Sequence, residues 1–168
     1  MSTTFDLGRL GLTSGEGRRF VLDVSLDGFA FGGERYTVAP RSVAVTLDVA
    51  RMTGGGWSLR VRFRATVEGP CMRCLGDAAP EIAVEAREVD QPGGESDQLD
   101  SPYVSGDELD LGAWSRDALA LALPAQIVCR EDCAGLCPEC GEDLNAHPHE
   151  HEREPDARWA KLSELRFD

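Results

Sequence analysis

The chain has 168 residues, 42% of them hydrophobic, which is enough for one globular core or one core with a small appendix. No apolar run approaches the ~20 residues needed to cross a bilayer, and residues 1–12 lack the basic start and apolar stretch of a secretory signal. We therefore expect a cytoplasmic protein whose thiols stay reduced, without a membrane partner.

The net charge of −13 arises in the second half of the chain. Residues 1–89 contain eleven arginines and eleven acids, whereas residues 90–168 contain six basic residues and nineteen acids. Such an acidic surface repels phosphate and attracts basic proteins. The second half is therefore expected to bind a basic protein, unless its charge serves solubility alone.

Apolar residues alternate with period two through the first half, which predicts β-strands. The segments 20–26 and 43–49 each place apolar side chains on one face. The strictest alternation runs from Trp57 to Glu68, after the glycine-rich turn 53–56. The second and third of these strands are predicted to form an antiparallel hairpin with one buried and one exposed face. Residues 82–89 form a further predicted strand.

The rest of the chain is predicted to contain a loop, one main helix and a short amphipathic segment. Residues 91–106 are rich in Pro, Gly, Ser and Asp, which predicts a flexible acidic loop. Apolar residues recur at helical spacing from Leu111, and Pro124 ends that pattern. A short amphipathic helix is expected within residues 156–165.

These elements predict an α+β fold: a curved or barrel-like antiparallel sheet, one main helix and a zinc-knuckle C-terminal segment. The expected parts are a β-rich region over 1–90 with the first cysteine pair, the loop over 91–106, and the helix with the Cys/His segment over 107–168. We expect them to form one compact unit.

Eight side chains are candidate metal ligands. Thiolates two residues apart chelate one ion, and the glycine after Cys137-Pro-Glu-Cys140 lets the backbone curl around it. Reduced cysteine clusters favour zinc in a structural site, with disulfides as the alternative. One ion on the local cysteines is expected first, although the ligands suffice for two, and spacing leaves open whether the distant pair joins. The candidates are Cys71, Cys74, Cys129, Cys133, Cys137, Cys140, His149 and His151.

His147 lies among the same tail residues as the two candidate histidines, and we expect it to be solvated. The pair Cys71-x-x-Cys74 also matches a thiol oxidoreductase motif. That motif normally begins a helix beside a βαβ unit, whereas this pair follows a predicted hairpin.

Arg60, Arg62 and Arg64 alternate on the exposed face of the longest predicted strand. They span about 13 Å at ~3.3 Å per residue, and could bind RNA phosphates with little sequence discrimination. The alternative is cross-strand pairing with acids such as Asp48 or Glu85.

Three segments together resemble the YceD family, named for large ribosomal RNA subunit accumulation. They are Cys71-Met-Arg-Cys74, residues 110–124 ending in Leu-Ala-Leu-Pro, and the cysteine-rich stretch 129–145. Two positions depart from the family pattern. His149 and His151 stand where members often have a C-x-C, and Ala157 stands where they tend to have proline.

The resemblance implies a non-enzymatic factor for synthesis, processing or stability of large-subunit (23S) ribosomal RNA. Its expected partners are that RNA, a pre-ribosomal particle or a basic ribosomal protein. The alternatives are a zinc-stabilised adaptor between proteins without RNA contact, and the thiol oxidoreductase. The sequence shows no P-loop, dinucleotide-binding or Ser-His-Asp pattern, so no small-molecule substrate is expected.

Overall fold

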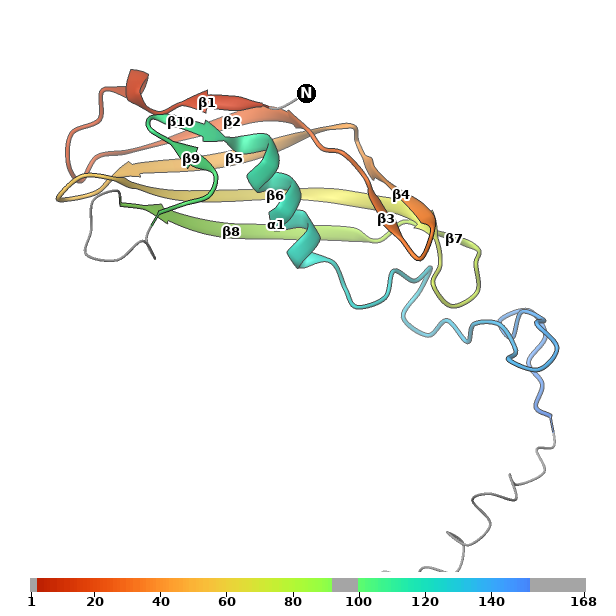
Figure 1. Cartoon of the computed structure of the whole chain (residues 1–168). Coiled ribbons are helices and arrows are strands. Elements are labelled where there is room, and N and C mark those ends of the chain that lie inside the picture. Colours follow the sequence, from red (N-terminus) through yellow and green to blue (C-terminus); the bar gives the residue numbers. More distant parts are fainter. Residues whose placement is uncertain (1–2, 92–99, 152–168) are drawn as a thin grey trace, which may run out of the picture.

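The computed structural model describes residues 3–91 and 100–151, which form two antiparallel sheets, a short 3-10 helix and one α-helix (Figure 1). The larger sheet contains β2 (Gly17–Ser25), β3 (Phe29–Phe31), β4 (Glu34–Ala39), β5 (Ser42–Arg51), β6 (Trp57–Pro70), β7 (Asp77–Ala78) and β8 (Glu81–Asp90). The smaller sheet contains β1 (Thr4–Asp6), β9 (Val104–Ser105) and β10 (Glu108–Asp110). The helices are η1 (Gly8–Leu10) and α1 (Leu111–Ala122).

Strand β6 organises the larger sheet, because four other strands pair with it. Strands β5 and β4 pair with successive parts of one edge of β6, and β8 and β7 pair with the other edge. Strand β2 extends the sheet beyond β5, and β3 extends it beyond β4. The strand ladders of the described residues leave β2 and β8 unpaired with each other, so this sheet stays open. The α+β class is confirmed, but the barrel-like closure is not found.

The predicted hairpin is the β5–β6 pair. Its turn uses Gly54, Gly55 and Gly56 with φ of 90°, 97° and 85°, a conformation in which other residues are strained. The inward residues of β6, from Trp57 to Val67, are buried as the alternation predicts.

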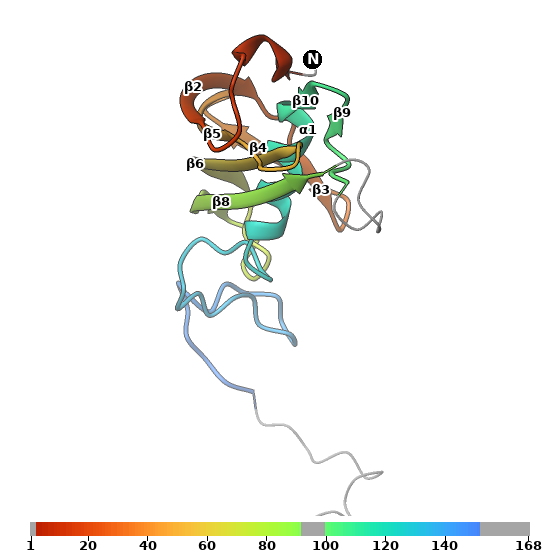
Figure 2. The same ribbon diagram turned by 90° about the vertical axis from the view of Figure 1, so that its left-hand side faces the viewer.

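Helix α1 and the smaller sheet cover one face of the larger sheet (Figures 1 and 2). Asp110 caps the N-terminus of the helix, because its carboxylate accepts a hydrogen bond from the Ala113 N–H (2.9 Å). The helix buries Leu111, Trp114 and Leu119 in the core. The other face of β2, β5, β6 and β8 carries the alternating polar side chains and is not covered by any described element. This arrangement leaves the arginines of β6 on an open surface.

The structure also contains elements that periodicity did not predict. The β3–β4 hairpin is too short for a clear alternating pattern, yet it buries Phe29 and Tyr36. Residues 100–106 were expected to be loop, but they include β9, and buried Ser101 donates its N–H to the Asp90 carboxylate (3.2 Å). The amphipathic segment predicted within 156–165 lies outside the described residues. The helix in the described part of the chain is too short to span a membrane.

Candidate metal centres and the outer sheet face

The eight predicted ligands fall into two separate groups of four. Within each group the ligand atoms all lie within 4.8 Å of one another. The four-cysteine group consists of Cys71, Cys74, Cys129 and Cys133. The Cys/His group consists of Cys137, Cys140, His149 and His151. Cys71 and Cys74 therefore join Cys129 and Cys133. The four cysteines of residues 129–140 divide between two groups, although they were expected to share one ion.

The four-cysteine group joins the end of the sheet to the segment that follows α1 (Figure 1). The Sγ atoms of Cys71 and Cys133 lie 3.8 Å apart, as do those of Cys74 and Cys129. A tetrahedral ion with metal–sulfur bonds of about 2.3 Å, the length typical of zinc, separates its sulfurs by about 3.8 Å. All six cysteines are free thiols, so the disulfide alternative is not found. The group fits a closed four-thiolate metal site.

The Cys/His group lies farther along the tail, where Cys137 is buried and Cys140 is exposed. The Nδ1–H of His149 donates to the His147 carbonyl (2.8 Å), which leaves Nε2 free as a ligand 3.1 Å from Cys140 Sγ. Tetrahedral coordination would separate sulfur and nitrogen by about 3.6 Å, so this group must open by about half an ångström around an ion. His147 is exposed and outside the group, as expected.

Two cysteine turns with the same hydrogen-bond pattern supply half of the ligands. In each, the N–H four residues after the first cysteine donates to that cysteine's carbonyl, at 2.9 Å in both turns. The first cysteine's own N–H donates to the carbonyl five residues later, at 2.6 Å after Cys71 and 2.8 Å after Cys137. The fourth residue after each first cysteine has positive φ: 61° at Leu75 and 77° at Gly141. Both segments therefore fold as knuckles that could hold a metal ion, although only one carries the predicted glycine.

The pKa values of the candidate thiol ligands are shifted in different directions. Burial raises the pKa of Cys71, but N–H groups of Cys74, Arg73 and Cys129 outweigh it and lower the value to about 6. Backbone N–H groups likewise lower the pKa of Cys137 to about 6. Burial and neighbouring thiols raise that of Cys129 to about 12. Adjacent thiolates repel one another, so four can ionise together only around a cation.

Arg73 and Asn145 organise these groups without being ligands. Arg73 donates Nε to the Gln126 side chain (3.0 Å) and Nη1 to the Cys133 carbonyl (3.1 Å), and its own carbonyl accepts the Leu136 N–H (3.0 Å). Asn145 accepts the Ala134 N–H and donates Nδ2 to Cys133 Sγ (3.6 Å). The sequence offered no role for either residue beyond its place in the motifs, because their partners lie far along the chain.

We expect Arg73→Ala to weaken the four-cysteine group. The substitution removes hydrogen bonds from a charged donor, each of which contributes at most about 1.5–3 kcal/mol net of competition with water. Release of bound metal to a colorimetric chelator should become faster by about tenfold or more, because the segment after Gln126 is held less firmly. Arg35→Ala, at an exposed site on β4, is the matched control and should leave the rate unchanged. Equal rates for both variants would contradict the role of Arg73.

On the outer face of the sheet, each of the three predicted arginines pairs with a carboxylate. Arg60 Nη2 lies 2.7 Å from Glu85 Oε1, and Arg62 Nη2 lies 2.9 Å from Asp48 Oδ2. Arg64 Nη1 lies 2.6 Å from Glu81 Oε1. The cross-strand alternative is therefore present, while RNA contact by this row stays a prediction.

Comparison with known proteins identifies the family. The family described as "Large ribosomal RNA subunit accumulation protein YceD" matches residues 59–166, which include most of β6, α1 and both groups of candidate ligands. Uncharacterized proteins of Mycobacterium tuberculosis and Mycobacterium bovis are 32% identical over 168 residues, covering 96% of this chain and 80% of theirs.

A maize protein named "Large ribosomal RNA subunit accumulation protein YCED homolog 1, chloroplastic" is 27% identical over 182 residues, covering 86% of this chain and 59% of its own length. No solved structure matches. The family match spans more than half of the chain and a mycobacterial relative aligns along nearly all of it. The chain therefore belongs to the YceD family.

Proposed function

We propose that this protein is a non-enzymatic, cytoplasmic factor in ribosome biogenesis that supports synthesis, processing or stability of large-subunit ribosomal RNA. The observation that carries the proposal is the family match, which covers the central strand, the helix and both ligand groups in one alignment. It binds an assembling particle or a basic ribosomal protein, and the face carrying Arg60, Arg62 and Arg64 contacts RNA.

In this proposal the two ligand groups each hold a structural zinc ion. The sulfur separations in the four-cysteine group support zinc there, and the mixed Cys/His donors support it in the tail. Bound zinc supplies cross-links between distant backbone segments. Cys71 and Cys74, the candidate redox pair, lie in the four-cysteine group next to two other thiols, which favours a metal ligand over a thiol catalyst.

A protein adaptor without RNA contact is the second candidate, and one observation favours it. All three arginines of the β6 row have carboxylate partners, and the second half of the chain is strongly acidic. An adaptor would bind a basic protein through that acidic half.

Depletion of the protein in its native cells tests the proposal. We expect the ratio of large-subunit to small-subunit ribosomal RNA to fall, and a tagged copy to sediment with large-subunit precursors in a sucrose gradient. Crosslinking then separates the two candidates, because only the first predicts RNA attached to the purified chain. An unchanged RNA ratio together with absence from the precursor fractions would contradict both.

A further inference from the structure

Four arginines on the outer face share only two carboxylates. Asp48 accepts from both Arg19 and Arg62, and Glu85 accepts from both Arg60 and Arg87. We name the four the arginine quartet: Arg19 on β2, Arg60 and Arg62 on β6, and Arg87 on β8. Hydrogen bonds from Arg19 and Arg60 lower the pKa of Asp48 and Glu85 respectively, so both acids are ionised at neutral pH. The quartet and its two acids thus have a net charge of +2.

The opposite end of the same face carries no such excess of positive charge. There Arg64 pairs with Glu81 alone, and the outward positions add Asp23 on β2 and Glu68 on β6 beside Arg35 on β4. The excess positive charge is therefore confined to one end of the face, its basic end. Within a chain of net charge −13, the basic end is a local region where an anion is attracted.

The quartet retains unused hydrogen-bond donors. Arg60 and Arg62 each contact their carboxylate through one Nη atom, and about a third of each side chain is exposed, whereas both Nε atoms are buried. A guanidinium has five N–H donors, and it binds phosphate well because its planar fork matches two phosphate oxygens. The exposed N–H groups can therefore also bind a phosphate, in competition with the carboxylates.

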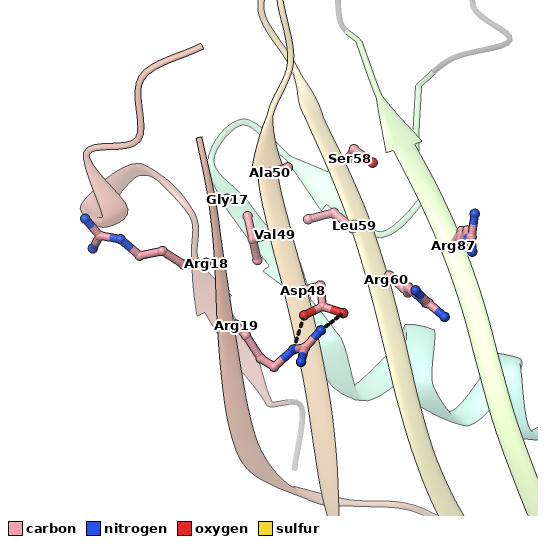
Figure 3. Close-up of a pocket in the computed structure, with 10 residues that line it drawn as sticks. All are labelled: Gly17, Arg18, Arg19, Asp48, Val49, Ala50, Ser58, Leu59, Arg60 and Arg87. Carbon is pink, nitrogen blue, oxygen red and sulfur yellow. Dashed lines mark hydrogen bonds and ion pairs between the residues drawn. The ribbon is translucent and has the colours of Figure 1, made fainter. Parts of the chain in front are cut away.

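Three arginines of the quartet lie around a hollow of about 460 Å³ on the open face of the sheet (Figure 3). Arg19, Arg60 and Arg87 line this hollow from three strands, whereas Arg18 points away from it in Figure 3. From β2 to β8 the quartet crosses three strand spacings, or about 14 Å. That span suits an extended chain of phosphates rather than one small anion.

We propose that the arginine quartet binds the phosphate backbone of single-stranded RNA across the strands of the sheet. The proposal rests on the ribosome biogenesis function and refines it, since it adds Arg19 and Arg87 to the contact surface and removes Arg64. Contacts of this kind give affinity without reading the base sequence. The two shared carboxylates compete with phosphate for the same guanidinium groups and therefore limit the affinity.

The test compares the variant Arg60→Ala/Arg87→Ala with Arg64→Ala as matched control. Binding of full-length, zinc-loaded protein to fluorescein-labelled oligo(U) RNA is followed by fluorescence anisotropy over a range of salt concentrations. Loss of two phosphate contacts should lower the affinity about 25-fold at about 0.1 M salt and reduce the slope of log K against log salt by about 1.4. Arg64→Ala should bind as the wild type does.

A second variant has an effect of opposite sign, which a purely structural role would not produce. Glu85→Gln removes a competing carboxylate and should raise the affinity for the same RNA severalfold. Unchanged binding by both Arg60→Ala/Arg87→Ala and Glu85→Gln, with circular dichroism showing intact folding, would overturn the proposal. Equal loss in Arg64→Ala would overturn it too, because the contact would then be the whole β6 row.

Different experimental results would contradict RNA binding by the quartet and the proposed function. If wild-type protein sediments with large-subunit precursors and the double variant does so equally, with equal RNA affinity, the quartet is wrong and the function stands. If wild-type protein never sediments with precursors, the function is wrong whatever the variants do.

Discussion

Replacing Cys71 and Cys74 by serine should remove one of two zinc equivalents and release the segment after Ile127 from the end of the sheet. These residues supply half of the four-cysteine group, and their partners Cys129 and Cys133 lie on that segment. Structural zinc contributes on the order of 10 kcal/mol of apparent folding free energy near neutral pH, far more than the few hydrogen bonds that remain there. The larger sheet should persist, because its core is formed by β-strands and α1.

Native mass spectrometry measures the number of bound zinc ions, and hydrogen exchange identifies the segment that is released. The N–H groups of Met72 and Leu136, which donate to the Ile127 and Arg73 carbonyls, should lose protection in the variant. The matched control is Cys137→Ser/Cys140→Ser, which should remove the other zinc and leave the Met72 N–H protected. A single zinc lost together by both variants would show that the two groups are one site.

Trp114→Ala should destabilise the whole sheet layer by about 3–5 kcal/mol, the cost typical of removing a buried aromatic side chain. Trp114 is 2% exposed, lies near the N-terminal end of α1 and stacks on Tyr103 with ring centroids 6.3 Å apart. Its loss opens a cavity between the helix and the inner face of the sheet. The helix and the strands on either side hold this cavity open.

The midpoint of urea unfolding, followed by circular dichroism of the zinc-loaded protein, measures this effect. Leu121→Ala is the control on the same helix, since Leu121 is 89% exposed, and it should shift stability by less than about 0.5 kcal/mol. Similar midpoints for both variants would contradict the packing of α1 against the sheet.

The metal ligands show both the strength and the limit of sequence reasoning. The residue types and spacings predicted the six cysteines as candidate ligands, because chelation by a knuckle is a local property of the chain. The family resemblance added His149 and His151, and the structure brings all eight candidates into groups that could hold metal. Their division into two groups was not predictable, since Cys71 and Cys133 are 62 residues apart and meet only through the packing of α1 and the sheet. Arg73 was missed for the same reason, whereas Asn145 was missed because its partners 11 and 12 residues away are brought to it by the irregular fold of its own segment.

The outer face of the sheet shows a similar division. Alternation placed Arg60, Arg62 and Arg64 outward, and Asp48 and Glu85 were recognised as available acids. The strand register decided that Arg19 also reaches Asp48 and that Arg64 has Glu81 to itself, whereas Arg87 lies two residues from Glu85 on the same strand. The excess charge of the quartet thus depends on pairing across three strand boundaries.

The sequence by itself determined the strands with strong alternation, the helix from Leu111, the candidate ligands and the family resemblance, because each depends on residues close together in the chain or on a motif. Only the tertiary structure decided that the sheet stays open, that the ligands form two centres and that the arginines share their acids. Those features depend on which distant segments pair and in which register, and the energies that select among such pairings come from packing over the whole core.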